Sequence, residues 1–170
     1  MFNMLEFRPE TWFEFLPPEV AVFLLSMLPV TELRGSIPIG LEIYNLNPFL
    51  TAIVAIVGNI FPIIFILLLL PRLHEWLLHQ KFVGSLLQKK LKHTEEKFKG
   101  KYPKYGALAL ILFVATPLPF TGAWTGSLAA FIFDIEFKKS FPLILIGICI
   151  AAVIVTLATL GIGSGLRFLV

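Results

Sequence analysis

The chain has 170 residues, of which 57% are hydrophobic and 15% charged, with a formal net charge of +3 and a mean hydropathy of +0.86. This apolar share exceeds the roughly 45–50% of an ordinary soluble domain, and it excludes that class of protein. The sequence therefore predicts an integral membrane protein. At this length we expect one transmembrane domain over residues 1–170 and no second domain.

Residues 5–16 are predicted to form an interfacial helix. Pro9 and Thr11 suit a helix start, and an aromatic cluster suited to the lipid headgroup layer surrounds them: Phe7, Trp12, Phe13 and Phe15. Packing of this helix against a partner subunit is the alternative. The N-terminal segment has an acidic start and lacks the basic region and the cleavage site of a signal peptide, so we expect this segment to be retained.

Residues 18–45 are predicted to form a re-entrant helical hairpin whose tip is the motif TELRGSIPIG, residues 31–40. The apolar arm over residues 20–31 reaches only about 18 Å as a helix, near the middle of a bilayer. Gly35, Pro38 and Gly40 expose backbone groups that must face protein, water or a ligand. Full crossing of the membrane by this stretch, which gives four spans in all, is the alternative.

Two charges lie in this motif, and charges in an apolar segment are candidates for function. Arg34 can hold a phosphate or carboxylate through two hydrogen bonds, beside the partial positive charge of a helix N-terminus. Glu32 can carry a proton or serve as an internal counter-ion. The alternative is that Glu32 and Arg34 pair only to hold the hairpin tip. The predicted binding and proton-coupling residues in this half are Glu32, Arg34, Gly35 and Pro38.

Residues 48–71 carry no charge over 24 residues and are predicted to span the membrane. Within this span, Asn59 is predicted either to line the substrate cavity or to form a hydrogen bond across helices. Glu42, which follows the tip of the first hairpin, is expected to be solvated at the outer surface.

Residues 72–104 form a basic linker with Arg72 and eight Lys against three Glu, a net charge of +6. The positive-inside rule places this linker in the cytoplasm. Apolar residues recur in it at helical spacing, so we expect a basic amphipathic helix on anionic membrane lipids. Nucleic-acid binding is the alternative that this charge allows, and we do not expect it.

Residues 106–133 are uncharged but interrupted by TPLPFTGAWTG, residues 116–126, which predicts a second re-entrant hairpin. Residues 141–166 then form the last transmembrane helix. Hydroxyl groups and open backbone in the second turn are predicted to line the substrate path. The residues concerned are Thr116, Pro117, Pro119, Thr121, Gly122, Trp124 and Thr125.

Each half of the chain therefore follows one plan of apolar arm, turn, second arm, polar break and unbroken span. The local echo pairs Thr31 and Leu33 with Thr116 and Leu118. Because one span separates the hairpins, they enter from opposite sides, which is the inverted-repeat design of many secondary transporters. The predicted fold class is an all-α integral membrane protein with this repeat, an interfacial helix and a basic cytoplasmic helix.

Other chemistries have no support in the sequence. Cys149 stands alone in an apolar segment, and the three histidines lack metal-ligand spacing, so we expect no metal site and no cofactor. We expect no enzyme, because no nucleophile stands with a base and no phosphate loop occurs.

The motifs TELRGSIPIG and TPLPFTGAWTGSLAA, with the basic linker between them, resemble the small multi-drug export protein family of prokaryotic membrane proteins. That family is similar in plan to the DedA superfamily, whose members are thought to carry two inward-facing re-entrant hairpins. They are thought to translocate carrier-lipid phosphates or other lipids, with proton coupling proposed. The resemblance implies Glu32 as the hairpin acid and Arg34 as its neighbouring base. TPLPFTGAWTG lacks the basic residues that DedA proteins carry there.

The function expected from the sequence is transport of a lipid phosphate, such as a polyprenyl phosphate, or of another small anionic or amphipathic molecule. A proton-coupled exporter of drugs or cations and a membrane scaffold without transport are the alternatives. We expect a homodimer, because a bundle this small would not enclose two half-membrane hairpins unaided. We expect the protein in the prokaryotic cell membrane, with both termini outside.

Overall fold

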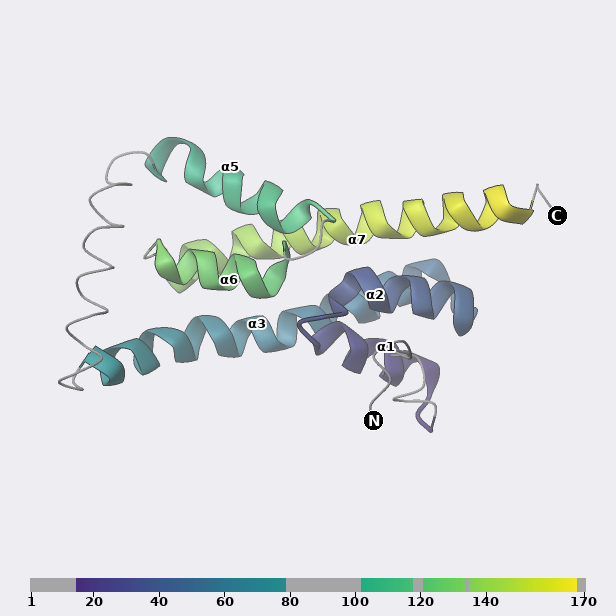
Figure 1. The fold of residues 1–170 in the computed structure, drawn as a ribbon, viewed down its shortest axis with the longest axis horizontal. Helices are drawn as coiled ribbons and strands as arrows, with labels where there is room; N and C mark the ends of the chain where they lie inside the picture. The colour runs from purple at the N-terminus through teal and green to yellow at the C-terminus, as the bar shows by residue number, and fades with distance from the viewer. Residues whose placement is uncertain (1–14, 79–101, 118–120, 134, 168–170) are drawn as a thin grey trace, which may run out of the picture. The chain divides into compact units, whose positions relative to one another are not determined.

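In the computed structural model, residues 15–78, 102–117, 121–133 and 135–167 are described (Figure 1). The all-α architecture is confirmed over these ranges, which contain no strand. Nearly all of the predicted interfacial helix and most of the basic linker lie outside the described residues. The helices are α1 (Pro18–Met27), α2 (Glu32–Pro38), the π-helix η2 (Ile39–Ile43), α3 (Pro48–Leu78), α5 (Tyr102–Ala115), α6 (Ala123–Ile132) and α7 (Phe137–Arg167).

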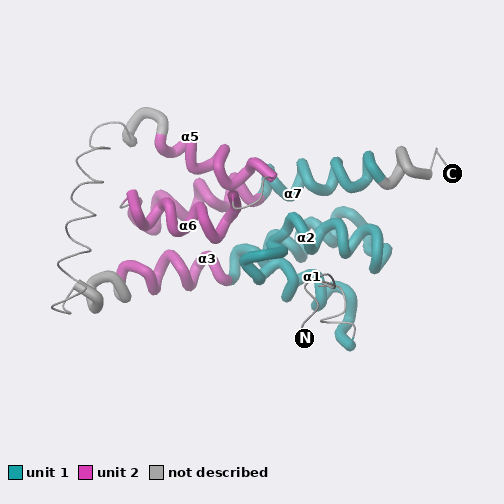
Figure 2. Tube along the Cα trace, in the orientation of Figure 1, with its two compact units in different colours: residues 1–61, 149–170 teal, residues 62–148 magenta. Residues whose placement is uncertain are grey.

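The chain forms two compact units (Figure 2). Unit 1 comprises residues 1–61 and 149–170, and it holds α1, α2, η2, the first part of α3 and the last part of α7. Unit 2 comprises residues 62–148, and it holds the rest of α3, then α5, α6 and the first part of α7. Each unit therefore combines short apolar helices with segments of both long helices.

In unit 1, the chain turns between α1 and α2 at residues 28–31. Leu28 has an extended backbone (φ −77°, ψ 138°), the conformation that a following proline favours, so α1 ends before Pro29. The Thr31 hydroxyl donates a hydrogen bond to a carbonyl of α1 and ties the turn to that helix. The turn thus precedes most of the motif of residues 31–40, which forms helix instead of the expected hairpin tip.

A glycine allows α3 to approach α1 closely in unit 1. A Cβ atom at Gly58 would lie 2.4 Å from the backbone oxygen of Phe23 and 2.9 Å from Ser26 Cβ, so a larger residue does not fit. At Gly40 in η2, a Cβ would lie 2.6 Å from Thr51 Cγ2 of α3. Small residues at such contacts are how helices pack closely in membranes.

In unit 2, a glycine likewise allows α7 to approach α5 closely. A Cβ atom at Gly147 would lie 2.7 Å from Val114 Cβ and 3.0 Å from the backbone oxygen of Ile111. Gly126 of α6 also contacts Val114, since a Cβ there would lie 2.5 Å from Val114 Cγ2. Both α6 and α7 therefore pack against Val114 of α5.

The two units share a pattern of contacts along the chain. Gly58 and Gly147 are each the eleventh residue of their long helix. Their partners are also equivalent, because Ser26 and Val114 lie 88 residues apart, as do the two carbonyl oxygens that these glycines approach. The buried, intermediate and exposed positions over residues 48–59 recur without a change over residues 137–148. One plan of helix packing therefore occurs twice.

The helices α2 and α6, which are the second arms of the two halves, correspond in a different register from the one that the sequence echo suggests. Buried positions of α2 recur in α6 at an offset of 90 residues, which pairs Thr31 with Thr121 and Glu32 with Gly122. The sequence echo pairs Thr31 with Thr116. Thr116 stands at the beginning of its turn, directly after α5, whereas Thr31 stands at the end of its turn, so the two are not equivalent.

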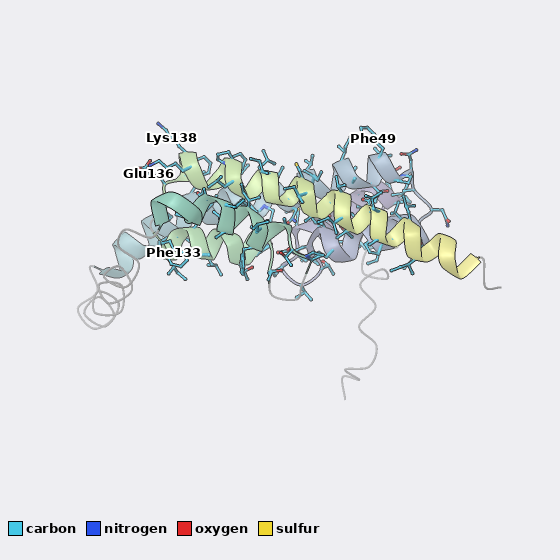
Figure 3. All side chains as sticks on the ribbon, turned by 90° about the horizontal axis from the view of Figure 1, so that it is seen from above. Phe49, Phe133, Glu136 and Lys138 are labelled. Carbon is cyan, nitrogen blue, oxygen red and sulfur yellow. The ribbon has the colours of Figure 1, made fainter. Side chains whose placement is uncertain are left out.

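Much of the surface of the two long helices is not covered by the rest of the chain. The spans Pro48–Pro71 and Phe137–Ile162 are long and apolar enough to cross a membrane, and only 28% and 33% of their most apolar segments are buried. Phe49 at the start of α3, for example, is 76% exposed (Figure 3). Uncovered apolar faces of this kind are suited to lipid, in agreement with a membrane protein.

The glycine contacts predict the response of the fold to added methyl groups. Gly58→Ala and Gly147→Ala should each lower the stability by about 1–3 kcal/mol, because the methyl group has no space. Gly161→Ala is the matched control, since nothing lies within 4 Å of a Cβ there and alanine favours a helix. Thermal unfolding of the purified protein in detergent measures the difference. Equal melting temperatures for all three variants would contradict the close helix contacts.

Candidate functional site

Glu32 begins α2 and is only 5% exposed. Its backbone φ of +45° lies in the left-handed region, which is unfavourable by about 1–3 kcal/mol for a residue with a side chain. Burial also removes water from the carboxylate, which therefore needs a partner. A strained and buried acid at a helix start is typical of a functional position.

Arg34 is that partner. Its Nη1 donates a hydrogen bond to Glu32 Oε2, and the two groups form an ion pair with side chains that are 18% and 7% exposed. The sequence left open whether these residues pair, and in the structure they do. The guanidinium is thus engaged by an internal carboxylate, so the pair has no net charge to attract an anion.

A pair of buried serines joins α1 to α2 one helical turn beyond Glu32. Ser26 Oγ donates to the Val22 carbonyl at 2.8 Å, so Ser36 donates in the hydrogen bond between the two serine hydroxyls. Sequence reasoning missed both serines. The available signal was the occurrence of a hydroxyl group in each apolar arm, where a polar side chain needs a partner.

Gly35 and Pro38 lie within the helical second arm and do not open its backbone as expected. The Ile39 N–H bonds to the carbonyls of Gly35 and Ser36, and η2 begins there. Proline removes one helical donor, and the wider π-helix that follows accommodates the break. π-Helical turns are frequent at functional sites, and this one directly follows α2, the helix that begins at Glu32.

Asn59 follows Gly58 on the buried face of α3. It is 1% exposed, and neither its Nδ2 nor its Oδ1 has a hydrogen-bond partner among the described residues. The predicted hydrogen bond across helices is therefore not found there. Asn59 belongs to unit 1, as do Glu32 and Arg34.

The other predicted site residues lie in unit 2, where hydroxyl groups close the turn between α5 and α6. Thr116 Oγ1 donates to the Leu112 carbonyl at 2.6 Å, and Thr121 Oγ1 donates to the Thr116 carbonyl at 2.7 Å. Gly122 is buried before α6, whose first turn contains Trp124 and Thr125. Pro117 is exposed, and Pro119 lies outside the described residues. The predicted site residues thus fall into two groups, one in each unit.

Residue types that bind metal do not gather in the described part of the chain, where no three His, Cys, Asp or Glu side chains form a suitable group. The lone Cys149 is exposed.

Comparison with known proteins identifies one family. The family model described as "Putative small multi-drug export protein" matches residues 32–154, which begin at Glu32 and cover well over half of the chain. The resemblance predicted from the two motifs is thereby confirmed. No curated protein and no solved structure matches the chain.

The ion pair predicts non-additive effects on stability. Glu32→Gln and Arg34→Gln should each destabilise the protein, because each leaves one buried charge without its partner. The double variant should be more stable than the sum of the single effects implies, with a coupling of about 1–3 kcal/mol. Unfolding in detergent of the four proteins in this cycle gives the coupling. Strictly additive effects would show that the pair is not formed.

Proposed function

The chain belongs to the small multi-drug export protein family, and on that premise we propose that it exports small amphipathic organic cations across the cell membrane in exchange for protons. The buried pair of Glu32 and Arg34 carries the proposal. A carboxylate that is held by an internal cation can exchange that cation for a proton or for a positively charged substrate. Competition of proton and substrate for one carboxylate then couples the two flows.

Translocation of a polyprenyl phosphate, expected from the resemblance to the DedA superfamily, has weaker support. An anionic site needs an available cation or an open helix end. Arg34 is engaged by Glu32, and the second turn, residues 116–126, contains no basic residue. The similarity to DedA proteins stays a prediction.

The proposed transporter has two re-entrant hairpins and two spans. The helices of the first hairpin have 10 residues in α1 and 12 in α2 with η2. At 1.5 Å per residue they reach about 15–18 Å, against about 30 Å for the hydrocarbon layer. The repeated contacts of Gly58 and Gly147 support a repeat, and a single crossing by α3 between the hairpins makes its copies opposite in orientation.

Charges at the helix starts support the same topology. Glu136 and Lys138 lie at the start of α7, near Phe133 at the end of α6 (Figure 3). The position equivalent to Lys138 at the start of α3 is Phe49, and Leu50 stands in place of a second lysine. Under the positive-inside rule, α7 starts in the cytoplasm and α3 starts outside.

Two further parts of the proposal concern partners. The basic linker binds anionic membrane lipids, and the protein forms a homodimer.

This topology predicts the location of the chain ends. Cysteines placed at Asn3 and at Val170, in a Cys149→Ala background, should both react with an impermeant thiol reagent added to intact cells. Labelling of both positions only after the membrane is opened would indicate four full spans instead. A cysteine at Lys89 in the linker is the control, because the proposal places it in the cytoplasm.

The exchange mechanism predicts that Glu32→Gln abolishes transport. In liposomes with an imposed pH gradient, ethidium transport by this variant should fall to the rate of protein-free liposomes, since glutamine binds neither a proton nor a cation. Glu42→Gln is the matched control, because Glu42 is an exposed acid on the same arm. It should transport ethidium like the wild type.

A parallel assay of polyprenyl phosphate flipping separates the two transport functions. Flipping that requires Glu32, without transport of ethidium, would replace the proposed function by lipid translocation. Wild-type activity of Glu32→Gln in both assays would contradict both functions.

A further inference from the structure

Asn59 is a buried amide without a visible role in packing. It is 1% exposed, and its donor and its acceptor both lack partners among the described residues. Buried polar side chains are ordinarily hydrogen-bonded, and one left without a partner lowers the stability of the fold. Such a group in a native protein requires an explanation.

A comparison with unit 2 indicates that helix packing does not explain the buried amide of Asn59. The residue equivalent to Asn59 is Ile148, which directly follows Gly147 as Asn59 directly follows Gly58. Ile148 is also 1% exposed. The same helix contact is therefore made with an aliphatic side chain in unit 2, and the amide of unit 1 is not needed for the contact itself.

The polar groups of unit 1 occupy equivalent positions that are mostly apolar in unit 2. Ser26, against which Gly58 packs, corresponds to Val114. Ser36, which bonds to Ser26, corresponds to Gly126. Ser36 lies one helical turn beyond Glu32 on α2, so the hydrogen bond between Ser26 and Ser36 joins the helix that Gly58 contacts to the helix that carries the ion pair. At these positions unit 1 therefore has polar side chains where unit 2 has residues without a polar side chain.

We propose that Asn59 is a substrate-binding residue of unit 1 that selects organic cations carrying an N–H or O–H group beside their charge. This inference rests on the proposed function. Glu32 neutralises the positive charge of the substrate, and the Asn59 carbonyl accepts a hydrogen bond from its donor group. A fully substituted cation makes the first interaction only. Unit 2 has no equivalent amide for such a site, because the corresponding position is Ile148.

Two cations test the selection in proteoliposomes. Ethidium carries amino groups, whereas tetraphenylphosphonium has no hydrogen-bonding group. Asn59→Leu should reduce ethidium transport by about tenfold, the effect of one lost hydrogen bond, and leave tetraphenylphosphonium transport within about twofold of the wild type. Ile148→Leu, the matched exchange in unit 2, should leave both rates unchanged.

The melting temperature in detergent supplies a second measurement. Asn59→Leu should melt at or above the temperature of the wild type, because an unsatisfied buried amide is replaced by an aliphatic side chain. A clear decrease, or an equal loss of transport for both cations, would show that the amide serves packing and would overturn the inference. So would unchanged transport of both cations. If Asn59→Leu does not fold, Asn59→Val, which is also aliphatic, is compared in the same way, with the same opposing outcomes.

Glu32→Gln in the same assay separates this inference from the proposed function. Loss of all transport in Glu32→Gln together with wild-type selectivity in Asn59→Leu overturns the role of Asn59 alone. Full transport by Glu32→Gln overturns the exchange mechanism, whatever Asn59→Leu does.

Discussion

Close contact between a long helix and a short one, allowed by a glycine, is the constraint on which both units depend. Apolar side chains gain little by leaving lipid for protein, so close packing has a large share in holding helices together in a membrane. Gly58 brings α3 against α1, and Gly147 brings α7 against α5. The position of the ion pair follows from this contact, because Ser26 both packs against Gly58 and binds the arm that carries Glu32.

Composition and uncharged length were enough to predict an all-α membrane protein, and the two turn motifs with the basic linker between them were enough to predict its family. The local path of the chain was not predictable in the same way. Pro38 and its neighbouring glycines indicated a break, but a proline does not reveal whether the backbone opens or widens into a π-helix. The equivalence of Thr31 with Thr121 rests on the pattern of buried residues, and sequence similarity does not reveal which residues are buried.

Residues of the candidate site were predictable where their chemistry is conspicuous. A carboxylate and a guanidinium in an apolar segment identified Glu32 and Arg34, although only the structure shows that they pair. Ser26 and Ser36 escaped prediction because single hydroxyl groups have no periodic pattern. Asn59 was a candidate from the sequence alone, but only the comparison with Ile148 indicates that the helix contact does not require an amide there. That comparison depends on the positions of Gly58 and Gly147 against their short helices. The helix contacts that recur in the two units thus supply a reference for judging an unusual residue.

The π-helix η2 also accounts for a difference of one residue between equivalent segments of the two units, residues 40–46 and 130–135. Leu46 N–H bonds to the Gly40 carbonyl at 2.9 Å, and Ile135 N–H bonds to the Ala130 carbonyl at the same distance, so the first segment is one residue longer. A π-helical turn holds one more residue than an α-helical turn. An insertion in the first half is therefore absorbed inside the helix and leaves the register of α3 unchanged. Deletion of one residue within η2 would give an ordinary α-helix, whereas deletion of one residue from α2 would rotate Glu32 by about 100° relative to η2.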